Sequence, residues 1–218
     1  MNWIERPDFS LDWMTISLLL SLLFLAVGKY LFQLRFVNFM VLPFNDKYMA
    51  LHNKRGELFN GFHVLLTIFQ VINLSLFIFL AQKIVLDSVL GSDSATFFFI
   101  LGGVVAFLAG KYILQKTKAY IFNTQGLVSE LLFSKISYLN HSSLVMCMGN
   151  ILLIYVLKDS KTVIYGTILL IVFINCIGIA KLLKNYQNTL VPNFIYFILY
   201  LCALEIAPLV VIGSYLKD

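Results

Sequence analysis

Charged residues are scarce in this sequence. They make up 12% of the 218 residues, whereas apolar residues make up 60%. A soluble domain usually has about 25% charged and about 45–50% apolar residues, so a soluble globular protein is excluded. The apolar residues come in runs of roughly 18 to 25, the length that an α-helix needs to cross ~30 Å of hydrocarbon. The composition predicts an all-α protein, a bundle of transmembrane helices that forms a single domain over residues 1–218.

Cysteine and histidine are also few, with three residues of each. The cysteines fall inside apolar runs and include no Cys-x-x-Cys pair, which is typical of small core residues. The histidines are scattered over three regions, so no metal site is predicted. The sequence contains no GxxxxGK[ST], GxGxxG, HExxH or GxSxG motif, and therefore gives no indication of a cofactor or of catalysis.

Six apolar runs predict membrane spans. They cover residues 13–32, 62–82, 95–114, 139–157, 162–180 and 194–216. Two mixed segments, residues 34–61 and 115–138, interleave basic, aromatic and aliphatic side chains. We expect both to lie at the membrane surface, or the second to continue the third span as a helix. Residues 158–161 leave room only for a tight turn.

The basic residues predict the orientation in the membrane. Most of the 16 Lys and Arg residues fall in the first, third and fifth loops, so the positive-inside rule places these loops in the cytoplasm and both termini in the periplasm. The net charge of +5 then indicates contact with anionic lipid and not with nucleic acid. The candidate contacts for lipid, an anionic substrate or an acidic partner are Lys47, Lys54, Arg55, Lys116 and Lys118.

The last apolar run contains a single charged residue, Glu205, followed three residues later by Pro208. A carboxylate at bilayer depth costs about 2.5–3.5 kcal/mol, so it faces the protein interior and takes a partner or a proton. Pro208 lacks the N–H that would bond the carbonyl of Leu204, and this predicts a kink.

Asn73, Asn150 and Glu205 lie at similar depths in their spans, each ~16 Å from the cytoplasmic start at 1.5 Å per residue. With Gln70 they predict an intramembrane polar cluster. One interpretation makes Glu205 a neutral acid that is hydrogen-bonded across a helix interface. The other makes it a site for a proton or cation, although apolar neighbours on its face favour the structural role.

Small residues recur at intervals of four in the third span, at Gly102, Ala106 and Gly110. Such a seam lets a neighbouring helix approach closely, so we expect a helix-packing surface here.

The tract YFILYLCALEIAPLVVI at residues 196–212 resembles the last helix of an uncharacterised integral membrane family of Bacteroidota that is defined by a domain of unknown function. The tract KAYIFNTQ at residues 118–125 is similar to the same family. The resemblance covers most of the chain and implies an inner-membrane protein of a diderm bacterium. It brings no established activity and no catalytic residues.

Three functions remain open. The sequence favours a non-enzymatic subunit or accessory factor of a larger envelope assembly that serves protein export or envelope biogenesis. The second hypothesis is a small proton-coupled transporter that uses Glu205. The third is an intramembrane enzyme acting on lipid, for which no nucleophile or pair of acids is evident.

Overall fold

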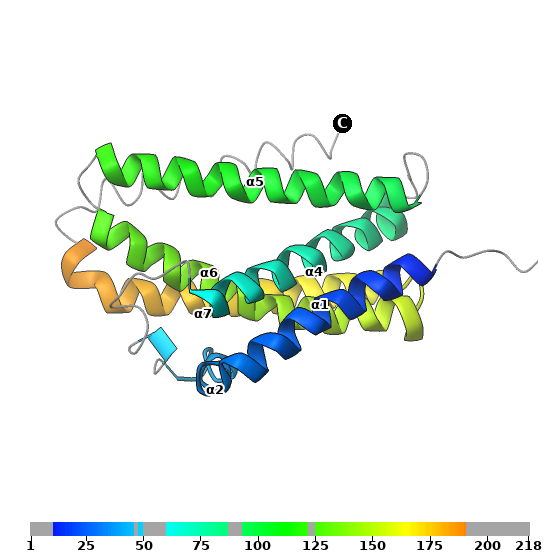
Figure 1. The fold of residues 1–218 in the computed structure, drawn as a ribbon, viewed down its shortest axis with the longest axis horizontal. Coiled ribbons are helices and arrows are strands. Elements are labelled where there is room, and N and C mark those ends of the chain that lie inside the picture. Colours follow the sequence, from blue (N-terminus) through cyan, green and yellow to red (C-terminus); the bar gives the residue numbers. More distant parts are fainter. Residues whose placement is uncertain (1–10, 46–47, 50–59, 87–92, 122–124, 191–218) are drawn as a thin grey trace, which may run out of the picture. The chain divides into compact units, whose positions relative to one another are not determined.

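The computed structural model describes residues 11–45, 48–49, 60–86, 93–121 and 125–190. All regular elements within these residues are helices (Figure 1). They are α1 (Leu11–Leu31), α2 (Gln33–Met40), α4 (Gly61–Leu86), α5 (Asp93–Ile121), α6 (Gln125–Ile151), the π-helix η2 (Leu152–Val156) and α7 (Lys161–Leu190). The predicted all-α class is therefore confirmed for this part of the chain.

Five of the described helices are long and apolar enough to cross a membrane. They cover Asp12–Leu31, Gly61–Val85, Asp93–Ile121, Val128–Val156 and Lys161–Leu182. Each coincides with one of the first five predicted spans. The sixth predicted span, residues 194–216, lies outside the described residues, and so do Glu205 and Pro208.

The third and fourth helices extend beyond their predicted spans. α5 continues past residue 114 to Ile121, and α6 begins at Gln125. The mixed segment 115–138 is therefore not a separate surface element, because it supplies the last turns of α5 and the first turns of α6. At 1.5 Å per residue the 29 residues of α5 measure about 44 Å, which exceeds the ~30 Å of hydrocarbon.

A tight turn joins η2 to α7, at the place where the sequence predicts one. Asp159 adopts a φ of 58°, in the left-handed region that Asp tolerates better than most residues. Before it, the Leu157 N–H donates to the Leu152 carbonyl at 2.7 Å, which gives the wider ring of a π-turn.

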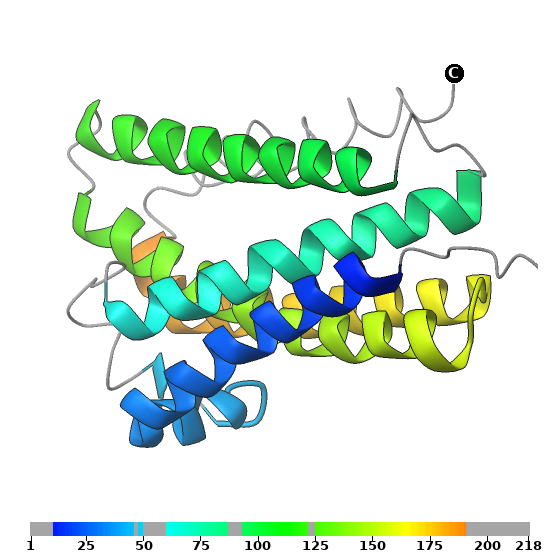
Figure 2. The same ribbon diagram turned by 45° about the vertical axis from the view of Figure 1, so that its right-hand side comes forward.

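α4 is the central helix of the fold. It packs against α1, α5 and α6, and Figures 1 and 2 show α5 on one side of α4 with α1 on the other. Two apolar clusters flank its middle. One contains Leu76, Phe79 and Ile84 from its second half, and the other contains Phe62 and Leu66 from its first half.

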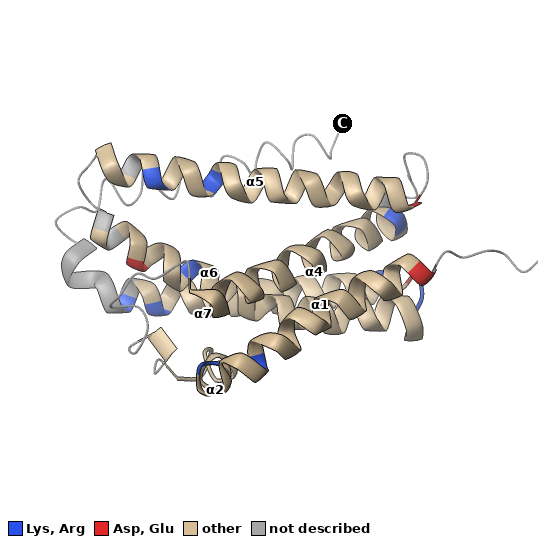
Figure 3. Ribbon diagram, in the orientation of Figure 1, with Lys and Arg blue, Asp and Glu red and all other residues tan. Residues whose placement is uncertain are grey.

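Charged side chains are few in the middle of the long described helices. Figure 3 shows few of them along the middle of α1, α4 and α5. The Lys83 ammonium contacts the Asp93 carboxylate at 2.7 Å and joins the end of α4 to the start of α5. The chain divides into two compact units, Met1–Gly178 and Ile179–Asp218, with the boundary inside α7. All the polar clusters described below belong to the first unit.

Candidate functional site

Two asparagines meet in the middle of the bundle, between the two apolar clusters. Asn73 on α4 and Asn150 at the end of α6 both have no exposed surface. The Asn150 amide donates to the Asn73 carbonyl oxygen at 3.0 Å and lies 3.4 Å from the Asn73 side-chain oxygen. The Asn73 amide donates to the Phe69 carbonyl within its own helix at 2.9 Å. The pair is therefore a hydrogen-bonded link between two spans.

Of the other residues predicted for this cluster, Gln70 is buried on α4 one turn before Asn73. Glu205 lies outside the described residues. The Asn150 side-chain oxygen is buried without a hydrogen-bond partner among the described residues. The cluster is therefore built from α4 and α6 in the part of the chain that the structure describes.

A second polar group lies nearer the start of α4, centred on the Ser137 hydroxyl. The His63 Nε2 atom is 3.2 Å from Ser137 Oγ, and Ser137 donates to the Phe133 carbonyl at 2.8 Å. The Tyr48 phenol is also hydrogen-bonded to Ser137. On the far side of the imidazole ring, Asn140 Nδ2 is 3.5 Å from His63 Nδ1.

One arrangement of the hydrogens is consistent with these contacts. If Ser137 gives its hydrogen to the Phe133 carbonyl, its oxygen accepts from His63 and Tyr48. A neutral His63 with its hydrogen on Nε2 then accepts from the Asn140 amide at Nδ1. A neutral ring suits a side chain with 3% of its surface exposed.

Tyr48 belongs to the segment between α2 and α4 and closes the site. Burial raises the pKa of its phenol well above the usual range, against smaller opposite effects of the Ser137 hydrogen bond and the Arg35 charge. The phenol is therefore a neutral donor at physiological pH. Its ring stacks on Phe133 at 6.0 Å between centroids and meets Phe39 of α2 edge-on at 5.9 Å.

The Ser137, His63 and Asn140 side chains have the order of a nucleophile, a base and an orienting group. The hydroxyl, however, is committed to a carbonyl, and Ser137 and Asn140 have no exposed surface. The group links the Tyr48 segment to α4 and α6. Within the described residues, no three His, Cys, Asp or Glu side chains are grouped to hold a metal ion.

The predicted small-residue seam faces away from the other described helices. A Cβ atom added to Gly102, Gly103 or Gly110 would have no neighbour within 4 Å. Two aromatic side chains of the same helix are also exposed, Phe98 to 66% and Phe99 to 85%. Among the described residues, α5 therefore contacts α4 and α6, and no atom of these residues lies within 4 Å of a Cβ placed at Gly102 or Gly110.

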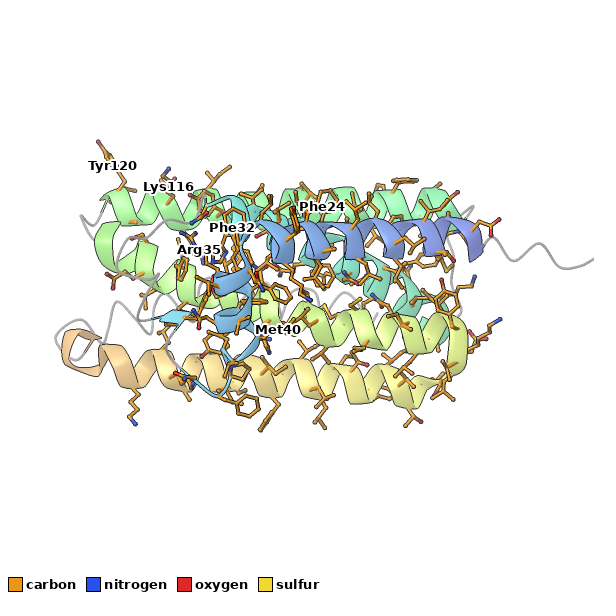
Figure 4. The ribbon with its side chains drawn as sticks, turned by 60° about the horizontal axis from the view of Figure 1, so that its bottom comes forward. Phe24, Phe32, Arg35, Met40, Lys116 and Tyr120 are labelled. Atoms are coloured by element: carbon orange, nitrogen blue, oxygen red, sulfur yellow. The ribbon has the colours of Figure 1, made fainter. Side chains whose placement is uncertain are left out.

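Of the predicted basic contacts, Lys116 is exposed near the end of α5. Figure 4 shows Lys116 and Tyr120 pointing outward from this end of the helix. The guanidinium of Arg35, which is not one of the predicted contacts, lies against the Phe32 ring, 5.8 Å from its centroid. The side chain of Lys118 and the residues Lys47, Lys54 and Arg55 lie outside the described part.

A family model for a domain of unknown function (DUF4271) matches residues 14–216. The chain belongs to the DUF4271 family. No curated protein and no solved structure matches it. The family match covers nearly the whole chain, including all the polar groups described above, so these groups lie within the DUF4271 domain.

Sequence reasoning missed the Ser137 group. His63 and Ser137 are 74 residues apart, and neither belongs to a recognised motif. A signal is nevertheless present in α6 of this DUF4271 chain, where polar residues recur every three positions on a slowly turning face. They are Ser134, Ser137, Asn140 and Ser143, all buried.

Proposed function

We propose that this DUF4271 protein is a non-enzymatic integral protein of the bacterial inner membrane. It acts as a subunit or accessory factor of a larger envelope assembly that serves protein export or envelope biogenesis. The observation that carries the proposal is the open small-residue face of α5, formed by Gly102, Ala106 and Gly110. We propose that a transmembrane helix of a partner subunit packs on this face.

The way in which helices pack in membranes supports a transmembrane helix as the partner of this α5 face. Lipid tails are as apolar as a leucine side chain, so helices associate in membranes through close backbone approach, which small residues allow. Glycine inside a helix costs about 1 kcal/mol relative to alanine, so glycines at an open position call for a compensating contact. The Cβ positions of Gly102 and Gly110 are open among the described residues, and that space fits a second backbone.

The buried polar groups support a non-catalytic role. The Asn150 amide donates a hydrogen bond to the Asn73 carbonyl on α4, and the Ser137 hydroxyl donates one to the Phe133 carbonyl. In the described part of the chain these groups tie helices together and do not line a path for substrate.

Purification in mild detergent tests the proposal. We expect the wild-type protein to recover at least one other envelope protein. Gly102→Leu and Gly110→Leu fill the open face and should reduce this recovery about tenfold, the equivalent of a loss of about 1.4 kcal/mol. Their own melting temperatures should not fall, because a Cβ at either position meets no described atom within 4 Å and leucine favours a helix more than glycine does. Phe107→Leu, an exposed position elsewhere on α5, is the matched control.

Two results would contradict the proposal. One is a disulfide from Ala106→Cys that forms only within the chain, because the face would then serve the protein itself. The other is a monodisperse monomer that alone catalyses ion flux in liposomes, which would favour the proton-coupled carrier. In the carrier, Glu205→Gln should fold normally and abolish flux, whereas in the structural interpretation Glu205→Gln is tolerated and Glu205→Leu is destabilising.

The proposed orientation places both termini in the periplasm and Lys54, Lys118 and Lys184 in the cytoplasm. Single cysteines at these positions should resist a membrane-impermeant reagent in intact cells, whereas cysteines near the termini should react. Strong labelling at position 54 or 118, with none at either terminus, would reverse the orientation.

A further inference from the structure

The short helix α2 turns away from α1 at Phe32. The backbone hydrogen bonds continue through this residue, because Phe32 donates to Gly28 at 3.1 Å and Phe36 donates to Phe32 at 2.9 Å. The Phe32 dihedrals are nevertheless not helical, with φ −132° and ψ 50°. Figures 1 and 4 show α2 running across the end of α1 instead of continuing its direction. Because α1 is long enough to cross a membrane, α2 then runs along the membrane plane at its boundary.

Apolar side chains cover two opposite sides of α2. Phe36 and Phe39 are buried against the rest of the bundle. Leu34 and Val37 are instead exposed, to 83% and 56%. At 100° per residue, the centres of these two pairs are about 160° apart around the helix axis. A surface helix usually has one apolar face, so the second apolar side of α2 calls for an apolar neighbour of its own.

The exposed side continues beyond both ends of α2. Val41 and Phe44 follow the helix in the next turn, and Phe44 is 89% exposed. Tyr30 and Leu31, at the end of α1, are also exposed. We call the exposed side of α2 and its following turn the outer face, and it consists of Leu34, Val37, Val41 and Phe44. The outer face therefore adjoins exposed apolar residues of a helix that can span the membrane.

The charged residues of this region are all basic. Lys29 is exposed in the last turn of α1, and Arg35 is half-buried on α2. The sequence has no acidic residue between Asp12 and Asp46. Lysine and arginine at a membrane surface attract anionic phospholipids, and tyrosine, such as Tyr30, is enriched at the same level. The charge and the position of the outer face thus favour phospholipid as its neighbour.

We propose that α2 is a membrane anchor that lies within one leaflet of the bilayer. The outer face packs against the acyl chains, and Lys29 and Arg35 bind the anionic headgroups of phospholipids. The opposite side of α2 packs into the cluster that contains Tyr48, whose phenol is hydrogen-bonded to Ser137. The anchor therefore connects the lipid leaflet to the polar group between α4 and α6. This contact with lipid does not depend on the envelope partner proposed above.

Spin labels on the outer face test the depth of α2. The three native cysteines are replaced, and Val37→Cys or Phe44→Cys carries a nitroxide in the purified full chain, in vesicles of phosphatidylcholine and phosphatidylglycerol. Oxygen concentrates among acyl chains, whereas a nickel chelate stays in water. Both labels should collide more often with oxygen, as should the exposed position Leu19→Cys on α1. Tyr120→Cys, which points outward at the end of α5, should collide more often with the chelate (Figure 4).

Two results of this measurement would overturn the anchor. Frequent collisions of both outer-face labels with the chelate would place α2 in water. Rare collisions with either reagent would show that protein, such as a second copy of the chain, covers the outer face.

Brominated lipids provide a second measurement that keeps the native cysteines. Phe44→Trp is placed in vesicles of one fixed lipid mixture, with bromine on the acyl chains of either phosphatidylcholine or phosphatidylglycerol, and its fluorescence is compared with that of wild type. Bromine quenches an indole that it contacts, so both lipids should quench, and phosphatidylglycerol should quench more strongly. Leu19→Trp, further from the basic residues, is the control and should respond equally to the two lipids. Absence of quenching in Phe44→Trp would contradict the anchor.

Substitutions assign the lipid preference to the two basic residues. In the Phe44→Trp protein, Lys29→Gln and Arg35→Gln should each lower the relative affinity for phosphatidylglycerol about fivefold, the equivalent of about 1 kcal/mol for one basic side chain near an anionic surface. Lys158→Gln, an exposed lysine in the turn before α7, is the control and should keep the preference. An unchanged preference in Lys29→Gln and Arg35→Gln would exclude the headgroup contact.

Discussion

The Asn150 side chain on α6 donates a hydrogen bond to the backbone carbonyl of Asn73 on α4, at 3.0 Å and across 77 residues of sequence. The Asn73 side chain contributes less to this link, because its amide is used within α4 and its oxygen is 3.4 Å from Asn150. The two asparagines are therefore not equivalent, although both are fully buried at the centre of the bundle.

This asymmetry predicts the order of damage when each asparagine is replaced. Asn150→Leu removes the interhelical donor and should lower the free energy of unfolding in detergent by about 0.6–1.7 kcal/mol. Asn73→Leu leaves the bond to its own backbone carbonyl in place and should cost less. Melting curves of the two variants provide the comparison, and a larger loss for Asn73→Leu would show that the 3.4 Å contact dominates.

Gly178 predicts a steric limit at the Tyr138 ring. A Cβ atom at Gly178 would lie 2.5 Å from Tyr138 Cγ, and that ring is buried and attached close to the backbone. Gly178→Ala should therefore force α6 and α7 apart and cost about 1–3 kcal/mol in melting experiments. Gly103→Ala, where the new methyl group meets open space, should leave stability unchanged or raise it by up to about 1 kcal/mol. Equal effects of the two substitutions would exclude this explanation.

Ser137 should matter more for stability than other buried serines of α6. Ser137→Ala removes one hydrogen-bond partner from His63 and one from Tyr48, and losing a hydrogen bond to a buried group costs about 1–3 kcal/mol. Ser143 is equally buried, but its hydroxyl only donates to the Asn140 carbonyl at 2.6 Å. Ser143→Ala is therefore the matched control, with an expected loss below about 1 kcal/mol.

Variants of Ser137 also test the enzymatic alternative. If the Ser137 group is purely structural, Ser137→Thr or a suppressor that restores stability elsewhere should restore complementation in cells. A stable Ser137 variant that folds as well as wild type but fails to complement would point to a nucleophile and would contradict the non-catalytic proposal.

Tyr48 predicts a loss of stability at high pH. The pKa of its phenol is raised by burial in the folded protein, relative to about 10 in the unfolded chain. The folded protein thus keeps this proton where the unfolded chain releases it, so stability is fully present below about pH 10 and falls as the pH rises further. Tyr48→Phe should remove this component, and the exposed Tyr120→Phe should not. Parallel pH profiles for wild type and Tyr48→Phe would contradict the assignment.

The sequence alone determined the class of the protein and the places of its spans. An apolar run of sufficient length in a membrane must be helical, because no water is present to satisfy the backbone N–H and carbonyl groups. The first five runs accordingly coincide with five helices. Counting residues along two spans also placed Asn73 and Asn150 at similar depths, because the rise of a helix is fixed. The turn at residues 158–161 followed from the shortness of the connection.

Counting residues does not give the rotation of each helix about its axis. Only the tertiary structure therefore showed which side chains meet across the bundle. Rotation depends on the packing of side chains from several helices at once. It turns Ser137 toward His63 and Tyr48, and it turns Asn150 toward Asn73. It also directs the Gly102 face away from α4, although the small-residue spacing itself is readable in the sequence. Depth along the membrane is thus a property of the sequence, whereas the choice of partner across it belongs to the packed bundle.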